Sequence, residues 1–75
     1  MITKTIYIEL LNEGTVVYRP VQASPVGKDL YRIESINKDP EDEEWRFPKG
    51  AIVRCGIRKL SSTEEALVAI EEILS

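Results

Sequence analysis

The sequence predicts a mainly β fold with one C-terminal α-helix, in which five short strands form a small SH3-like antiparallel barrel. Three observations lead to this fold class. Segments before residue 60 alternate apolar and polar side chains or are rich in β-branched and aromatic residues, as half-buried strands are. Most Gly and Pro residues fall between these segments, where turns are expected. After residue 60 the apolar residues follow a helical period. We therefore expect an SH3-like barrel over residues 1–60 and an amphipathic helix over residues 61–75, within one domain.

The first two strands are expected to form a hairpin. In residues 3–11 the apolar side chains at alternate positions from Ile6 to Leu10 share one face. The following Asn12-Glu13-Gly14 predicts a three-residue loop, because glycine readily takes the left-handed conformation that closes it. In the second strand Pro20 has no amide donor, so that strand must lie on a sheet edge or carry a bulge at Pro20.

A turn at residues 24–27 is expected to follow the second strand. Residues 37–44 are strongly acidic and contain Pro40, which predicts a solvated, mobile loop. In the last strand Cys55 is expected to face inward with Val53 and Ile57. The arginines of this strand, Arg54 and Arg58, then face outward. The four strands after the first are placed at residues 15–23, 29–36, 44–47 and 51–60.

The C-terminal segment carries the signals of a helix. Either Ser61 or Ser62 can cap the first amides, with a glutamate three places later to complete a capping box. The helix is expected to pack on the barrel or on a partner, and in the second case the protein is a homodimer. The apolar residues Ala66, Leu67, Ile70, Ile73 and Leu74 fall on one stripe of this helix.

The rival fold is the oligonucleotide/oligosaccharide-binding barrel, which usually has a helix where this chain has its acidic loop.

Composition limits the function classes. The chain has 75 residues and no histidine. Its net charge of −3 argues against nucleic acid and anionic membranes as main partners. Without histidine and with Cys55 as the only cysteine, no zinc site or other cofactor site is expected. No apolar run is long enough to span a bilayer, and the residues after Met1 do not resemble the basic stretch and apolar core of a signal sequence, so we expect a cytoplasmic protein without a membrane partner.

Catalysis is not expected. Cys55 has no histidine to serve as its base, and the carboxylates of the acidic loop lack the unlike, partly buried environments that acid-base chemistry requires. The glycines do not form a phosphate-cradling run. We therefore expect no catalytic, cofactor-binding or metal-binding residues, and a protein that is not an enzyme.

Two stretches combine an aromatic ring, an arginine and a proline: Tyr18-Arg19-Pro20-Val21 and Trp45-Arg46-Phe47-Pro48. Together with Tyr31-Arg32-Ile33 and with Gly50, Val53, Arg54 and Cys55, these stretches resemble a family of short uncharacterised bacterial proteins over roughly residues 6–55. The resemblance implies a bacterial source and a small barrel, and it carries no activity, cofactor or catalytic residue.

The leading hypothesis is a non-enzymatic module that binds a protein or peptide through a surface around Tyr18, Arg19, Trp45 and Arg46, because rigid rings at strand ends suit peptide recognition. Phe47 is expected in the core, whereas Trp45 could serve the core or the binding surface. The alternative is an RNA-binding small barrel that uses a row of arginines. A third possibility is an enzyme subunit that completes the site of another chain. The residues of the RNA-binding row are Arg46, Arg54 and Arg58.

Overall fold

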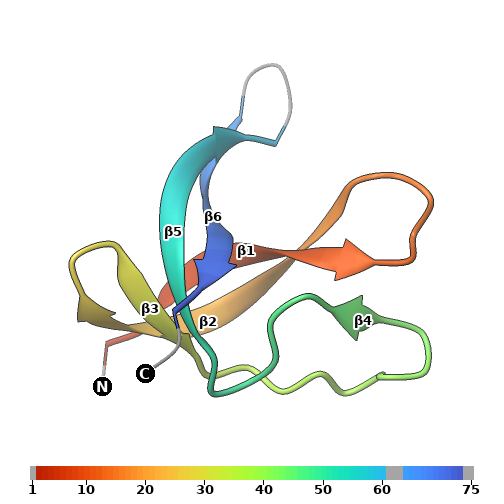
Figure 1. Cartoon of the computed structure of the whole chain (residues 1–75), viewed down its shortest axis with the longest axis horizontal. Helices are drawn as coiled ribbons and strands as arrows, with labels where there is room; N and C mark the ends of the chain where they lie inside the picture. The colour runs from red at the N-terminus through yellow and green to blue at the C-terminus, as the bar shows by residue number, and fades with distance from the viewer. Residues whose placement is uncertain (1, 61–63, 74–75) are drawn as a thin grey trace.

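The computed structural model describes residues 2–60 and 64–73, and these residues form an all-β fold of six strands. Figure 1 shows two long hairpins that cross, one made by the first two strands and one by the last two. The strands are β1 (Lys4–Leu11), β2 (Val17–Gly27), β3 (Leu30–Ile33), β4 (Glu44–Trp45), β5 (Ile52–Lys59) and β6 (Glu65–Glu72).

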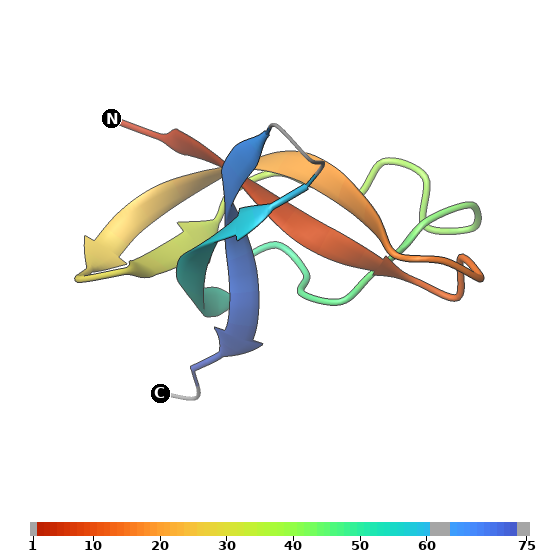
Figure 2. The same ribbon diagram turned by 90° about the horizontal axis from the view of Figure 1, so that it is seen from above.

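Five of the strands pair in a closed ring. β1, β2, β3, β5 and β6 each pair antiparallel with the next, and β6 returns to β1 through the pair Tyr7↔Val68. This last pairing is parallel. Parallel closure is unavoidable, because an odd number of strands that alternate in direction gives the first and last the same direction. The expected wholly antiparallel, SH3-like barrel is therefore wrong. Figure 2 shows β6 crossing β1 at the closure.

The predicted C-terminal helix is also wrong. Residues 65–72 form β6, which pairs with β5 from Lys59↔Glu65 to Val53↔Glu72. Helix propensity differs by only a few tenths of a kcal/mol between most residues. This small preference is outweighed here by the backbone hydrogen bonds that residues 65–72 form as a strand, which also completes the ring. The proposed caps at residues 61–63, and residues 74–75, lie outside the described residues. The expected homodimer through a C-terminal helix is therefore not supported.

β2 is longer than expected and moves the following turn. It continues to Gly27, with an irregularity in its pairing between Pro25 and Gly27, so the turn lies at residues 28–29 instead of 24–27. Asp29 takes a positive φ of 60° there. Of the two alternatives that Pro20 predicted, an edge or a bulge, the structure shows an edge, because β3 pairs with β2 only from Ala23 onward.

The first hairpin loop differs in length from the prediction. Gly14 has a φ of 77°, the left-handed conformation expected of it. Asn12 is also left-handed, with a φ of 59°, and the last pair before the loop is Leu10↔Val17. The loop is therefore longer than the three residues expected.

The core fills the ring. Phe47 lies in it, as expected, and Trp45 and Leu67 are partly buried against it. Ile57 does not face the core but is 58% exposed, because β3 covers β5 only from Ile52 to Arg54 and the hairpin of β5 and β6 projects beyond the ring. The buried cluster comprises Ile6, Ile8, Val21, Ala23, Ile33, Phe47, Ala51, Val53, Cys55 and Ala69.

Helices that could cross a membrane do not occur within residues 2–60 or 64–73.

Candidate binding pockets on two faces of the sheet

The residues predicted to form one surface are divided between two faces of the sheet. Successive side chains of a strand point to opposite faces. Arg19 pairs with the buried Ile8, whereas Tyr18 pairs with Glu9 on the outer face. The same alternation separates Trp45 from Arg46. Two distinct pockets result, and we call them the Trp45 pocket and the Arg58 pocket.

The Trp45 pocket is an open depression of about 410 Å³ between β2 and the segment that leads to β4. Its apolar part includes Pro20, Trp45 and Ile36, of which Ile36 is 58% exposed. It holds the predicted site residues Arg19 and Trp45. The full lining is Arg19, Pro20, Val21, Ser35, Ile36, Asn37, Lys38, Asp39, Glu43 and Trp45.

Glu43 holds the tryptophan ring and the arginine of this pocket together. Its Oε1 accepts hydrogen bonds from Trp45 Nε1 and from Arg19 Nε, each at 3.1 Å. Arg19 Nη2 donates to the other carboxylate oxygen. Trp45 thus packs partly against the core, while its indole N–H is bound to Glu43 at the pocket.

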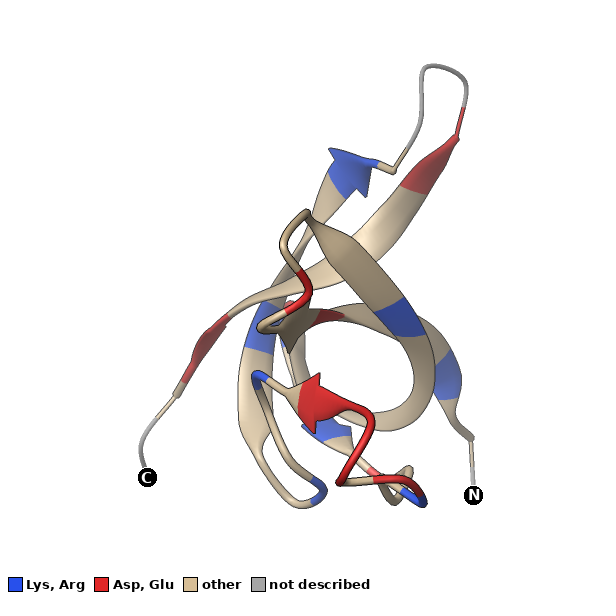
Figure 3. Ribbon diagram, turned by 90° about the vertical axis from the view of Figure 1, so that its right-hand side faces the viewer, with Lys and Arg blue, Asp and Glu red and all other residues tan. Residues whose placement is uncertain are grey.

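The acidic segment before β4 is anchored by hydrogen bonds. Asn37 Nδ2 donates to the carbonyl oxygen of Glu43 at 2.8 Å, and the Asp39 amide donates to Asn37 Oδ1 at 3.0 Å. The amides of Asp42 and Glu43 both donate to the Asp39 carbonyl oxygen. Figure 3 shows how the acidic residues gather on this segment and on β4.

Glu43, which binds both Arg19 and Trp45, was not among the site residues predicted from the sequence. It lies within a run of carboxylates and was expected to be solvated. Its spacing could have identified it, because residues two apart in an extended segment lie on the same side, and Glu43 precedes Trp45 by two.

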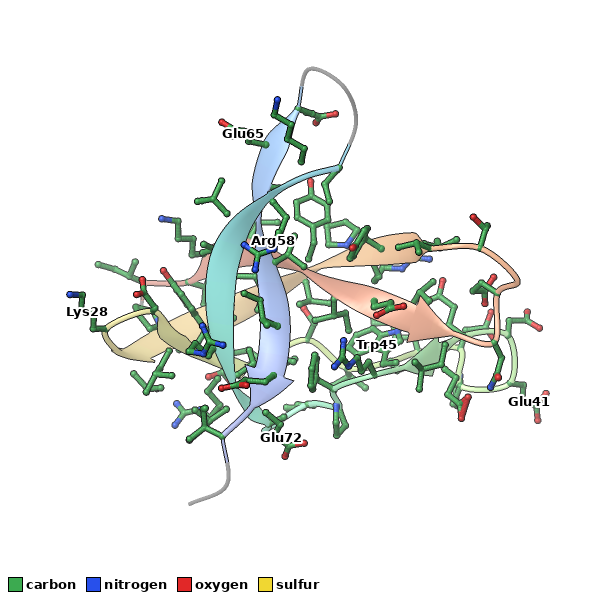
Figure 4. The ribbon with its side chains drawn as sticks, turned by 45° about the horizontal axis from the view of Figure 1, so that its top comes forward. Lys28, Glu41, Trp45, Arg58, Glu65 and Glu72 are labelled. Atoms are coloured by element: carbon green, nitrogen blue, oxygen red, sulfur yellow. The ribbon has the colours of Figure 1, made fainter. Side chains whose placement is uncertain are left out.

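The Arg58 pocket, of about 270 Å³, lies on the outer face where the two hairpins cross. It brings together three of the predicted site residues, Tyr18, Arg46 and Arg58, and adds Lys59. Figure 4 places Arg58 near the crossing, apart from Trp45. The lining residues are Glu9, Tyr18, Arg46, Arg58, Lys59, Val68, Ala69 and Ile70.

Arg46 is held in the Arg58 pocket by β1 and by a ring. Its Nη1 lies 3.3 Å from Glu9 Oε1, and its guanidinium carbon lies 5.0 Å from the centre of the Phe47 ring. The backbone amide of Arg46 also donates to the Glu9 carbonyl oxygen, at 3.1 Å. This arginine is therefore fixed, and its charge is partly neutralised.

Arg58 folds back over its own strand. Its Nη1 donates to the Ile57 carbonyl oxygen at 2.9 Å and would lie 3.2 Å from a Cβ placed on Gly56. Gly56 is paired with Val68, and a Cβ there would lie only 2.7 Å from Ile70 Cδ1, so the glycine leaves room mainly for Ile70 beside the pocket. Neither Arg58 nor Lys59 forms an ion pair with another described residue, although Glu65 is opposite Lys59 in the register.

Arg54 lies outside both pockets. Its Nε is 3.0 Å from Glu71 Oε1, across the pair of β5 and β6. This hydrogen bond raises the pKa of Arg54 and lowers the pKa of Glu71, and the attraction of the two charges adds to both shifts. Of the three arginines in the predicted row, Arg46 and Arg58 line the Arg58 pocket, whereas Arg54 lies outside it and pairs with Glu71.

The chemistry of the remaining groups is limited. Burial, with a smaller contribution from the Asp29 charge, raises the pKa of the Cys55 thiol to about 11. No set of three or more Cys, Asp or Glu side chains in the described part of the chain is arranged to hold a metal ion.

Comparisons of the chain with known protein families, with curated proteins and with solved structures find no match.

Proposed function

We propose that this chain is a non-enzymatic module that binds a protein or peptide through the Trp45 pocket. The observation that carries the proposal is the clamp of Glu43 on Trp45 and Arg19, which holds a flat ring at the edge of an open, partly apolar pocket. A ring fixed in this way loses little conformational entropy when a ligand binds, which favours recognition of an apolar side chain.

The partner chemistry follows from the lining. The pocket offers Trp45, Pro20 and the exposed Ile36 to an apolar anchor, and the exposed Lys38 and Asp39 also line it. We therefore infer a partner segment that inserts an aliphatic or aromatic side chain next to polar residues. The absence of histidine and the raised pKa of Cys55 support a role without catalysis. The cytoplasmic location, the bacterial source and the family resemblance remain predictions.

A displayed library of random peptides tests the proposal, with affinities of selected peptides measured by the fluorescence of Trp45, the only tryptophan of the chain. We expect the selected peptides to alter this emission and to lose binding to the Ile36→Glu variant. Ile57→Glu is the matched control, because Ile36 and Ile57 are both 58% exposed and only Ile36 lines the pocket. Equal binding to both variants would show that the peptide uses another surface.

The RNA-binding alternative remains a prediction in its original form. It requires Arg46, Arg54 and Arg58 in one row, and the pairing of Arg54 with Glu71 lends that row no support.

A further inference from the structure

We propose that the Arg58 pocket binds a nucleotide, with its phosphate on Arg58 and Lys59 and its base against Tyr18. The proposal is independent of the peptide site, because the two pockets lie on opposite faces of the hairpin of β1 and β2. Three features of the pocket lead to it: cations without carboxylate partners, an aromatic residue, and an apolar floor.

The cations give the pocket its preference for an anion. Arg46, Arg58 and Lys59 face a single lining carboxylate, Glu9, which Arg46 already engages. Arg58 and Lys59 form no ion pair among the described residues. Apart from the hydrogen bond of Arg58 Nη1 to the Ile57 carbonyl oxygen, their donors are therefore available to phosphate oxygens. Guanidinium and ammonium groups bind phosphate through short, charge-assisted hydrogen bonds. This local positive charge contrasts with the net charge of −3 of the whole chain.

The other lining residues favour a ligand with a flat, weakly polar body. Tyr18 is half-buried on the outer face, and Val68 and Ile70 line the same pocket. All nucleobases can stack on aromatic side chains, whichever base is present. A volume of about 270 Å³ lies just below the range of typical small-molecule sites, so the pocket holds no more than about one nucleotide. The acidic side chains of a peptide would bind the cations but would not account for Tyr18 and the apolar Val68 and Ile70 in the lining.

The first test is a titration of the ¹⁵N-labelled full chain, followed by NMR, with three probes: uridine monophosphate, uridine and inorganic phosphate. We expect saturable shifts at the amides of Tyr18, Arg58 and Val68. The nucleotide should bind more tightly than either of its parts. Absence of saturable shifts, or equal affinity for the nucleotide and uridine, overturns the proposal.

Charge variants locate the site. Arg58→Gln should weaken nucleotide binding by about tenfold or more, the effect of removing a charge-assisted hydrogen bond. Arg54→Gln is the matched control, because Arg54 is an arginine of the same strand and lies outside the pocket. The affinity of this variant for the nucleotide should be unchanged. Equal losses in the two variants overturn the assignment.

A gain-of-binding variant covers the case in which Arg58→Gln fails to fold. Glu9→Gln releases Arg46 from its carboxylate and removes the one negative charge of the pocket lining. Nucleotide binding should therefore become several-fold tighter, which damage to the structure would not produce. Weaker or unchanged binding in this variant contradicts the proposal.

The source of the nucleotide is decided by comparing uridine monophosphate with a short oligouridylate. Tighter binding of the oligomer with a steeper dependence on salt assigns a single strand, because each additional phosphate contact releases counterions. Equal affinity assigns a free nucleotide. A glutamate-rich peptide serves as the remaining probe, and tighter binding of this peptide than of either nucleotide overturns the proposal.

Discussion

Glu43 acquires a role that its neighbours in the acidic segment do not share. Asp39, Glu41, Asp42 and Glu44 are exposed, whereas the Glu43 side chain is only 21% exposed beneath Arg19. Its carboxylate accepts from two side chains, while its own carbonyl oxygen accepts from Asn37. One residue thus couples the acidic segment to β2 and to β4.

Replacement of Glu43 by glutamine should loosen this coupling. The amide cannot accept the arginine through two charged oxygens, so we expect a loss of stability of about 1 kcal/mol. The emission of Trp45 should shift to the red as its indole N–H meets water. Glu41→Gln is the control, because Glu41 is exposed and belongs to the same acidic segment. Thermal unfolding and fluorescence measure both variants, and identical behaviour of the two would contradict the clamp.

Cys55 illustrates what burial does to a reactive group. The residue is 3% exposed and its thiol has a pKa of about 11, so only about one thiol in a thousand is ionised at pH 8. We expect a disulfide reagent to modify the native protein very slowly and the unfolded protein at once. Fast, stoichiometric reaction of the native protein at pH 8 would contradict the buried position.

The raised pKa of Cys55 also sets a dependence of stability on pH. The folded state holds the thiol proton more tightly than the unfolded state, whose ordinary value is 9.0. The contribution of Cys55 is therefore complete below pH 9.0 and is lost as the pH rises through about 11. Urea unfolding from pH 8 to 11 should show a smaller alkaline loss of stability in Cys55→Ala than in the natural sequence.

At the scale of elements, β6 shows why a short apolar run is ambiguous. The run Ala66-Leu67-Val68-Ala69-Ile70 is apolar at every position. Such a run fits the apolar stripe of a helix and equally well a strand that is buried on both faces. In the structure Ala69 faces the core, whereas Val68 lies under the outer pocket. An irregularity in the pairing of β6 with β5, between Arg54 and Cys55, accompanies this double burial.

A pair of substitutions at Glu72 distinguishes the strand from a helix. Glu72 is exposed near the end of β6, where intrinsic preference has most influence. In a strand, Glu72→Thr should be more stable than Glu72→Ala, by up to about 1 kcal/mol. In a helix the order is reversed, because alanine is the best helix former. Denaturant unfolding of the two variants gives the order directly.

At the scale of the whole molecule, the ring depends on its last strand. β6 lies between β5 and β1, and without it the two strands have no connection on that side. Removal of β6 would also remove Ala69 from the core cluster. The core residues Val53 and Cys55 would lose the strand with which they pair. For a chain this short, the buried surface is too small to tolerate such a loss.

A chain that ends after Leu60 should therefore fail to fold. We expect an NMR spectrum without dispersion and no cooperative thermal transition, in contrast to the full chain measured alongside. The barrel that the sequence predicts over residues 1–60 would instead survive the truncation. A folded fragment would contradict the closed ring.

Some of this fold was predictable from local patterns. The alternation from Ile6 to Leu10, the left-handed Gly14 and the edge position of Pro20 each follow from the steric and hydrogen-bonding properties of a few neighbouring residues. The strands near residues 3–11, 15–23, 29–36, 44–47 and 51–60 were located in this way, although β2 is longer and β3 is shorter than expected.

The sequence by itself determined which residues are apolar at strand spacing and which residues turn the chain, because these depend on short-range geometry. Only the tertiary structure decided that residues 65–72 are a strand, that Glu43 clamps Trp45, and that Tyr18 and Arg46 lie on a different face from Arg19 and Trp45. Each of these depends on which segments pair across the sheet. Such pairing is a long-range choice, made by the need to satisfy backbone hydrogen bonds and to close the ring around one core.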